Sequence, residues 1–235
     1  MAKVKKQKEQ EHHNELLENP EALAEQLSRT EVYVEENKGL VLGIGLVLLL
    51  VVGGYFGWNA YKDSQNEKAQ NEMFQAVYYF ESDSLDVAIN GDGNNLGFKD
   101  IIDEYGMTEA ANLANFYAGA AYLKKGDYKS ALLYLEDFEA DDLLVQARAY
   151  SLMGDAHMEL GEYADAADMY EKAASYKENK FFSPQYLMKA ALAYEKANDL
   201  EAAKKSYDTI INDFWDSSEV QEAKKMRAQL EKSAS

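Results

Sequence analysis

The chain of 235 residues contains no cysteine. Disulfide bonds and thiolate metal sites are therefore excluded. The absence suits an oxidising compartment outside the cytoplasm, although it is also common by chance. Histidine is scarce as well, with three residues. His12 and His13 are adjacent in a polar segment that offers no third ligand, so they predict no metal site.

Basic residues are in short supply. The chain has 24 Lys and Arg against 42 Asp and Glu, a net charge of −18 at pH 7. Such a surface repels nucleic acid phosphates and anionic lipid head groups. We therefore expect no nucleic acid partner, and we expect any bound polypeptide to be basic or apolar.

Catalytic motifs are also missing. The sequence has no nucleophile elbow, no glycine loop that would cradle a phosphate and no zinc-protease motif. Asp141 and Asp142 are neighbouring carboxylates, but we expect them in a solvated loop. Residues 90–97 (NGDGNNLG) look like a calcium loop, yet no register supplies both the required glycine and the ligands. We expect a glycine-rich turn there, and no enzyme activity, cofactor or metal.

One long apolar run is present, over residues 39–58 (GLVLGIGLVLLLVVGGYFGW), and it contains no charged side chain. A helix of this length spans about 30 Å, which matches one bilayer core. A helix also satisfies every backbone group within the segment, as lipid requires. We therefore expect a single transmembrane helix over residues 39–58.

Cations beside this run predict its orientation, because the positive-inside rule counts Lys and Arg and largely ignores carboxylates. Residues 1–38 are richer in them than the residues just past the run, which offer Lys62 and Lys68. No small-residue cleavage site follows the run, so we expect an uncleaved anchor. Residues 1–38 then form a cytoplasmic tail, and residues 59–235 lie in the periplasm of a bacterium, beyond its inner membrane.

The tail itself contains a helix signal. Asn19 followed by Pro20 is a good helix start, and Leu23, Leu27 and Val34 are spaced along one face of the resulting short amphipathic helix. This helix either docks on a cytoplasmic partner or merely extends the membrane span.

Small residues occur in pairs at both ends of the apolar run. Gly39 with Gly43, and Gly53 with Gly57, have the spacing that lets another membrane helix approach closely. Glycine is common in membrane helices in any case, so ordinary composition is an equal alternative.

The chain past residue 108 repeats itself. Four positions recur at intervals of 35 and then 37 residues, as Gly119, Gly126, Tyr128 and Ala131, then Gly154, Gly161, Tyr163 and Ala166, then Ala191, Asn198, Leu200 and Ala203. A period near 34 residues resembles the tetratricopeptide repeat, which consists of two helices around a turn.

Each recurring position has a physical role in such a repeat. The first position (Gly119, Gly154 and Ala191) allows close approach of two helices. The second position (Gly126, Gly161 and Asn198) ends the first helix in the left-handed conformation. The third is expected to fix the turn to the core, and the fourth keeps the helix crossing tight. His157 occupies the position of Tyr122 and Tyr194, and we expect it to line the core with a satisfied ring nitrogen.

These patterns divide the chain into regions. Residues 59–108 are expected to form a linker helix over about 63–80 and a short helix over 98–105, which together make a degenerate leading hairpin. Three repeats follow over residues 109–216, at about 112–145, 147–181 and 184–216. Residues 217–235 contain a capping helix over 217–232, with Ser217 or Ser218 as its N-cap. The predicted fold is all-α, a single N-terminal transmembrane helix followed by a tetratricopeptide-repeat α-solenoid.

Tetratricopeptide repeats usually bind peptide segments or helices in their concave groove. Tyr117, Tyr150 and Tyr186 are candidate groove residues, although many of the tyrosines in this chain must belong to the core.

The junctions of the apolar run carry a more specific resemblance. Residues 32–39 (VYVEENKG) and Gly57-Trp58 with Tyr61 resemble the membrane entry and exit of the YfgM-like family. The segment around residues 90–97 looks more like the Bacteroidota branch of that family than the proteobacterial one. In that branch Ser84, within Asp83-Ser84-Leu85, would resemble an O-glycosylation site.

Members of the YfgM-like family are ancillary subunits of the Sec translocon and associate with the periplasmic chaperone and prolyl isomerase PpiD. The resemblance implies a non-enzymatic, membrane-tethered adaptor that recruits a chaperone beside SecYEG and assists emerging exported chains. The alternative is a scaffold for envelope assembly or a secretion machine unrelated to Sec. A hydrolase with an unrecognised site is a third class.

Overall fold

The structure is a computed structural model that describes residues 20–233. Within these residues it is helical throughout, which confirms the predicted fold class at that level. The chain divides between Tyr61 and Lys62 into two compact units. His12 and His13 lie outside the described residues.

The first unit contains two helices, α2 (Pro20–Glu36) and the first part of α3 (Lys38–Glu81). Helix α2 begins at Pro20, where the ring fixes the backbone and the missing N–H costs nothing. Helix α3 continues without a break from the apolar run into the linker region. Its most apolar window has a mean hydropathy of 2.4, so α3 is long and apolar enough to cross a membrane by length and composition.

The apolar part of α3 contacts nothing else in the described chain. A Cβ atom added at Gly39, Gly43, Gly53 or Gly57 would meet no atom within 4 Å. Most of the aliphatic side chains between these glycines are exposed, and Val41 is half-buried. The apolar surface of this segment therefore has no intrachain partner among the residues described.

The second unit begins with the end of α3, then α4 (Leu85–Asn90) and α5 (Phe98–Tyr105). Helix α5 has the expected bounds, and Phe98 and Ile101 are fully buried against Ala114 and Ala118 of the following helix. Helix α4 was not expected from the sequence. Its Ala88 and Ile89 are fully buried, so tertiary packing stabilises a helix of little more than one turn.

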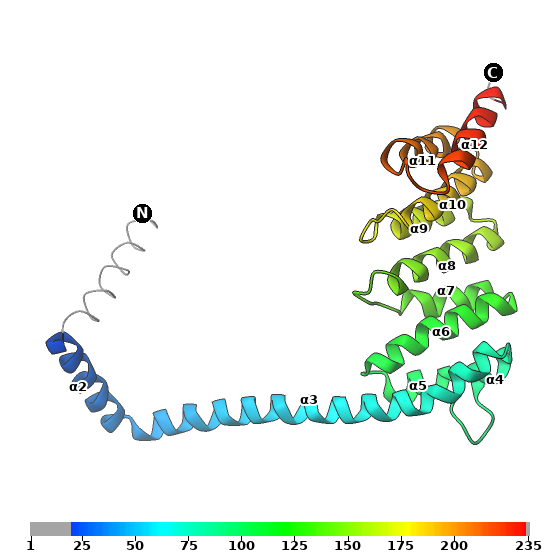
Figure 1. Ribbon diagram of the computed structural model, residues 1–235. Helices are drawn as coiled ribbons and strands as arrows, with labels where there is room; N and C mark the ends of the chain where they lie inside the picture. The colour runs from blue at the N-terminus through cyan, green and yellow to red at the C-terminus, as the bar shows by residue number, and fades with distance from the viewer. Residues whose placement is uncertain (1–19, 234–235) are drawn as a thin grey trace. The chain divides into compact units, whose positions relative to one another are not determined.

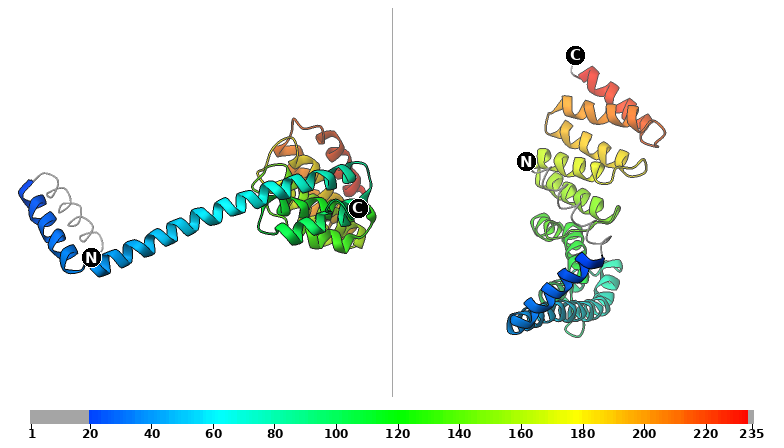
Figure 2. Two further views of the ribbon diagram at one scale, coloured as in Figure 1. Left: turned by 90° about the horizontal axis from the view of Figure 1, so that it is seen from below. Right: turned by 90° about the vertical axis from the view of Figure 1, so that its left-hand side faces the viewer.

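Six helices then stack in chain order, with each packed on its neighbour (Figures 1 and 2). They form three hairpins: α6 (Glu109–Lys125) with α7 (Tyr128–Glu136), α8 (Val145–Leu160) with α9 (Tyr163–Ser175), and α10 (Ser183–Lys196) with α11 (Leu200–Asp213). Separate apolar clusters lie between successive helices instead of one central core. This arrangement is expected of a stack in which each repeat covers only its neighbours.

Helix α12 (Val220–Ser233) closes the stack by burying Val220, Ala223 and Leu230. The predicted N-cap is wrong, because the helix starts after both serines. The Ser218 hydroxyl bonds the Glu219 carboxylate at 2.9 Å, and the Ser217 N–H donates to the Phe214 carbonyl at 2.9 Å. These local bonds form a turn, so the helix begins at Val220 and not at the serines.

Candidate functional site

The two helices of each hairpin meet at the first recurring position. A Cβ atom on Gly119 would lie 2.5 Å from Cγ of Leu135, and one on Gly154 would lie 2.6 Å from Cε1 of Tyr170. In the third hairpin Ala191 packs in one cluster with Tyr207. The first two hairpins therefore require glycine, whereas the third has room for a methyl group.

The turns within the hairpins have the left-handed backbone that the sequence predicts. Gly126, Gly161 and Asn198 have φ values of 81°, 78° and 62°. Asp127 and Asp199 then cap the next helix, each accepting a backbone N–H through its side chain, whereas Glu162 makes no such bond. The alanines at the fourth recurring position are fully buried, namely Ala131, Ala166 and Ala203.

The third recurring position differs from the expectation. Tyr128, Tyr163 and Leu200 are half-buried and do not belong to the core. Each follows the cap residue on the first turn of the second helix, where its side chain lies at the surface of the stack. Tyr128 instead reaches the next repeat, with its hydroxyl 3.3 Å from Oε2 of Glu159.

Of the three tyrosines predicted as groove residues, Tyr117 and Tyr186 pack within the stack, whereas Tyr150 also lines a recess beside Tyr176. Tyr117 is stacked on Phe98 with ring centres 5.5 Å apart. Tyr186 is 9% exposed in a cluster with Ala173 and Ala174. Tyr150 is half-buried against the same cluster, because small alanines on α9 leave space that aromatic rings fill.

A different surface connects the repeats. We call it the inter-repeat hollow, a recess of about 470 Å³ that extends from the end of α6 across α8 to α10. Its lining consists of Leu123, Tyr128, Asp155, Met158, Glu159, Tyr170, Lys189 and Leu192. Of these, Leu192 is 44% exposed although it is a large aliphatic residue.

A hydrogen-bond network holds the hollow together across the repeat boundary. Oδ1 of Asp155 accepts the Tyr170 hydroxyl at 2.6 Å and Nζ of Lys189 at 2.7 Å. Lys189 also donates to Oγ of Ser151 at 3.2 Å. Burial, and then the bond to Asp155, raises the pKa of Tyr170 well above its usual range, so the hydroxyl stays a donor at neutral pH.

The chemistry of the hollow suits a polypeptide. Leu123, Met158 and Leu192 offer apolar contact, and the exposed carboxylate of Glu159 offers a partner for a cation. Because Lys189 is already bonded to Asp155, its charge is balanced within the hollow. The internal alignment contained a signal for this surface, since Leu123 and Met158 occupy the same position in successive repeats.

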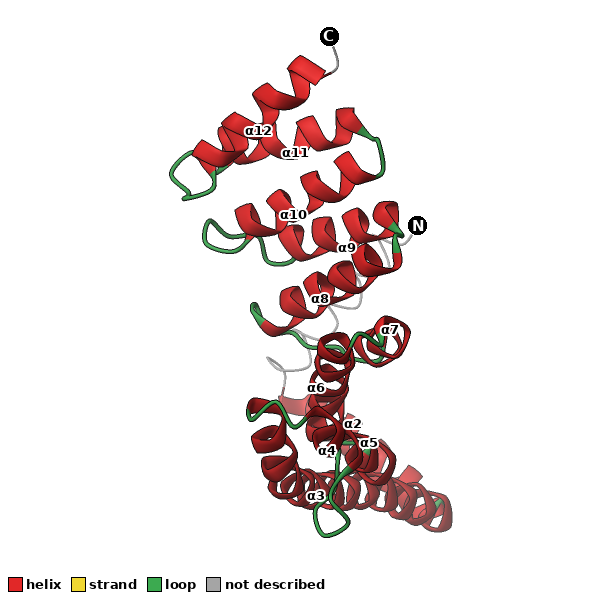
Figure 3. Ribbon diagram, turned by 90° about the vertical axis from the view of Figure 1, so that its right-hand side faces the viewer, coloured by secondary structure: helices red, strands yellow, loops and turns green. Residues whose placement is uncertain are grey.

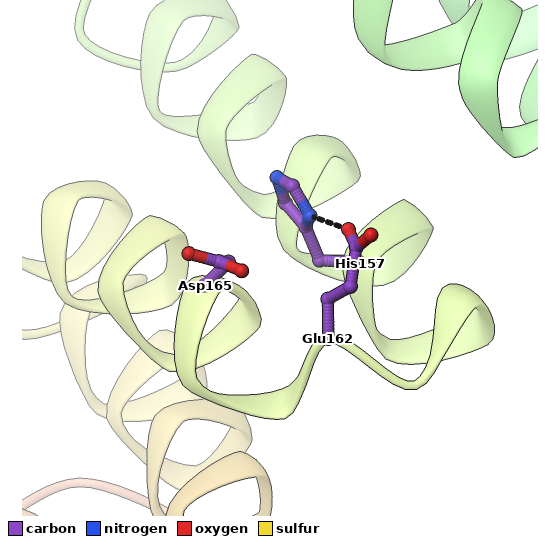
Figure 4. Close-up of side chains that lie close together, drawn as sticks. All are labelled: His157, Glu162 and Asp165. Carbon is purple, nitrogen blue, oxygen red and sulfur yellow. Dashed lines mark hydrogen bonds and ion pairs between the residues drawn. The ribbon is translucent and has the colours of Figure 1, made fainter.

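One group of side chains could hold a metal ion. His157, Glu162 and Asp165 each offer a ligand atom, and these atoms all lie within 4.8 Å of one another (Figure 4). Nδ1 of His157 is 2.7 Å from Oε2 of Glu162, and the histidine side chain is 16% exposed. This contact satisfies the ring nitrogen, as expected for His157, and joins the end of α8 to the start of α9.

The 90–97 segment is organised around Asp92. Its carboxylate accepts the backbone N–H groups of Asn94 at 2.8 Å and Asn95 at 2.7 Å, and the Tyr79 hydroxyl at 2.6 Å. The Tyr79 bond and then the bonds from Asn95 lower the pKa of Asp92. The carboxylate thus fixes a turn by means of protein donors.

The remaining predicted positions are ordinary surface residues. Asp141 pairs with Lys177, and Asp142 accepts two N–H groups at the start of α8. Ser84 is exposed between α3 and α4. Glycosylation at Ser84 stays a prediction.

Comparison with known families identifies the repeats. A model described as a tetratricopeptide repeat-like domain matches residues 34–143, and two tetratricopeptide repeat models match residues 147–180 and 184–212. No curated protein matches the chain. Tetratricopeptide-like domains are therefore present in the chain, with matches that begin at residue 34 and end at residue 212.

These repeats define the class of the protein. The tetratricopeptide repeat is a protein-binding module, and the second unit is a stack of such repeats. The chain thus contains tetratricopeptide-like repeats, and these indicate a protein–protein interaction adaptor or scaffold.

Proposed function

We propose that the protein is a non-enzymatic, membrane-tethered adaptor whose repeats recruit a partner protein through the inter-repeat hollow. The observation that carries the proposal is α3, a single helix that contains the apolar run at one end and residues buried in the second unit, Ala69 and Met73, at the other. The candidate tether and the first buried residues of the repeat unit therefore belong to the same helix in the sequence.

The location follows from the sequence. In this proposal the apolar run is the membrane anchor, and the excess of Lys and Arg before it favours a cytoplasmic amino terminus. The repeats then lie in the periplasm, with the anchor in the inner membrane. Substitution of Leu48 and Leu49 by Arg should release the protein from membranes, because each Arg near the centre of a span costs about 3 kcal/mol.

The partners follow from the resemblance of the junction residues to the YfgM-like family. The adaptor would stand at the periplasmic exit of the SecYEG translocon and recruit a PpiD-like chaperone and prolyl isomerase. The apolar and acidic lining of the hollow is also suited to segments of emerging exported chains. Gly43 and Gly57 are the positions at which the anchor would approach a translocon helix.

The test is affinity purification of the full-length protein from membranes in a mild detergent, with quantitative mass spectrometry. The expected result is recovery of SecYEG together with a periplasmic isomerase. Leu192→Ser should reduce recovery of the isomerase and leave SecYEG unchanged, whereas Gly43→Leu should do the opposite. Leu133→Ser, at an exposed leucine of α7 outside the hollow, is the matched control.

The alternative is an envelope-assembly or secretion-machine scaffold unrelated to Sec. Recovery of such a machine without SecYEG would reject the translocon proposal in favour of the scaffold. Hydrolase activity that persists in the protein after release from the membrane would reject the non-enzymatic proposal.

A further inference from the structure

The long connections between hairpins lie along one edge of the stack, and the short turns within hairpins lie along the opposite edge (Figure 3). We call the first the connection edge and define it as residues 137–144, 176–182 and 214–219. Its segments touch one another. The Tyr176 hydroxyl donates to the Ala140 carbonyl at 2.8 Å, and Nζ of Lys180 is 3.3 Å from Oδ2 of Asp216.

The connection edge exposes large apolar side chains at each of its segments. Leu144 is 49% exposed, Phe181 68% and Trp215 73%, and the neighbouring Leu143 and Phe182 are exposed as well. The opposite edge has small or polar residues in its turns, Gly126-Asp127, Gly161-Glu162 and Asn198-Asp199. Exposed apolar groups that recur along one edge form a surface that favours a partner.

Two recesses flank the first segment of this edge, with volumes of about 580 Å³ and 480 Å³. The larger has an apolar floor that includes Leu113, Phe138 and Val145, and its rim includes the carboxylates of Glu109 and Glu139. An apolar stem that ends in a cation matches this lining. Lys and Arg have such side chains.

Charge decides which partner fits. Lys177 forms an ion pair with Asp141, and Lys180 forms one with Asp216. The positive charges of these two lysines are therefore neutralised by carboxylates of the same edge. The carboxylates of the rim then leave an excess of negative charge. Anionic lipid head groups are repelled by it, and a second copy of a chain with net charge −18 would bring the same charge to the contact.

We propose that the connection edge is a docking surface for a polypeptide segment in which Lys or Arg alternates with aliphatic or aromatic residues. The apolar side chains of the segment contact Leu144, Phe181 and Trp215, and one of its cations enters the recess between Glu109 and Glu139. This surface is separate from the inter-repeat hollow, and the inference does not depend on the function proposed above.

The experiment uses the full-length protein in phosphatidylcholine nanodiscs and a dye-labelled synthetic peptide of alternating Lys and Leu with one Phe. Fluorescence anisotropy should show saturable binding above that of empty nanodiscs, weakened by salt. A peptide with Glu in place of Lys should not bind. The combined variant Leu144→Ser, Phe181→Ser and Trp215→Ser should bind at least about tenfold more weakly, which is about 1.4 kcal/mol.

Two further variants separate the alternatives. Glu109→Gln with Glu139→Gln leaves the apolar groups in place and should weaken binding and reduce its salt dependence, which keeps the test valid if the serine variant fails to fold. Leu192→Ser, in the hollow, and Leu133→Ser should bind as the wild type does. In a Trp58→Phe background Trp215 is the one remaining tryptophan, and its emission should shift to the blue on binding.

Several results would overturn the proposal. Unchanged peptide binding by both edge variants would do so, as would loss of binding in Leu192→Ser alone, which would assign the peptide to the hollow. A dimer of the full-length protein in sedimentation that disappears in the serine variant would assign the edge to a second copy. The purification described above tests the hollow independently of these results.

Discussion

Gly154 of α8 lies directly against the ring of Tyr170 of α9, so that a Cβ atom on the glycine would be 2.6 to 2.9 Å from three ring carbons. The same ring donates its hydroxyl to Asp155, the next residue of α8. The absence of one side chain therefore allows α8 and α9 to pack closely enough for the ring to reach the hollow.

Gly154→Ala should destabilise the second repeat. Alanine favours a helix by about 1 kcal/mol, but overpacking against a buried ring costs about 1–3 kcal/mol. We expect a net loss in the free energy of unfolding, measured by urea titration of the full-length protein in detergent. Ala191→Gly is the matched control and should cost about 1 kcal/mol through helix propensity. A more stable Gly154→Ala variant would contradict the close contact.

A substitution at the turn glycine Gly161 reports on backbone conformation alone, because an added side chain would contact no other atom. It has φ of 78° and no atom within 4 Å of an added Cβ. Gly161→Ala should cost about 1–2 kcal/mol, because an L side chain in the left-handed region is strained. Asn198→Gly, at φ of 62°, should be neutral or stabilising for the same reason. Equal stability of wild type and Gly161→Ala would show that the turn does not require this conformation.

Tyr170 should make stability depend on alkaline pH. Its pKa is raised above the ordinary value of 10.0 by burial and by Asp155. The neutral hydroxyl therefore contributes stability that is complete below pH 10 and is lost as the pH rises further. Burial also raises the pKa of Tyr194 to about 12, so several tyrosines contribute to this decline.

The corresponding variant is Tyr170→Phe. It should lose about 1–2 kcal/mol at neutral pH, because the hydrogen bond to a carboxylate is removed while Lys189 still pairs with Asp155. Its stability should decline less than that of wild type above pH 10, as measured by urea titration across the alkaline range. Tyr128→Phe removes a longer hydrogen bond to Glu159 at the surface. It should therefore change the free energy of unfolding less than Tyr170→Phe does, both at neutral pH and above pH 10. A decline in Tyr170→Phe as steep as in wild type would reject the role of Tyr170.

Asp142 should stabilise the start of α8 at neutral pH. Its Oδ1 accepts the N–H of Val145 at 2.8 Å and of Leu144 at 2.7 Å, and these bonds lower the pKa of Asp142 from its ordinary value of 3.8. Stability is thus present above that value and is lost as the pH falls below it. Asp142→Ala should lower Tm by about a few degrees at pH 7 and converge with wild type in acid.

The neighbouring Asp141 provides the control for Asp142. It is highly exposed and pairs with Lys177 at the surface, where ion pairs contribute little. Asp141→Ala should leave Tm nearly unchanged in thermal unfolding followed by circular dichroism. An equal fall in Tm for the two variants would show that the capping bonds of Asp142 are not the source of the effect.

Local patterns predicted much of this protein. The all-helical fold, the hairpins and the left-handed turn residues are apparent from self-similarity, because each depends on residues near in sequence. Helix α4 was missed because six residues are too few for a periodic pattern, and burial of Ala88 and Ile89 stabilises it. The start of α12 was misplaced because Ser217 and Ser218 bond neighbours in a turn.

The binding surfaces were the least predictable part. Tyrosine is common at interfaces, but Tyr186 fills space beside Ala173 and Ala174 that appears only when α9 and α10 pack together. The inter-repeat hollow combines side chains from five helices, and no single segment contains its pattern.

The sequence by itself determined which segments are helical, where each hairpin turns and which stretch is apolar enough for a membrane. Propensity, backbone conformation and hydropathy are properties of a residue and its near neighbours. The tertiary structure decided which aromatic rings are buried, which carboxylates face a recess and which apolar side chains stay exposed on the connection edge. Those properties depend on distances between residues of different repeats, such as Tyr170 and Lys189 around Asp155, and only the packed stack fixes them.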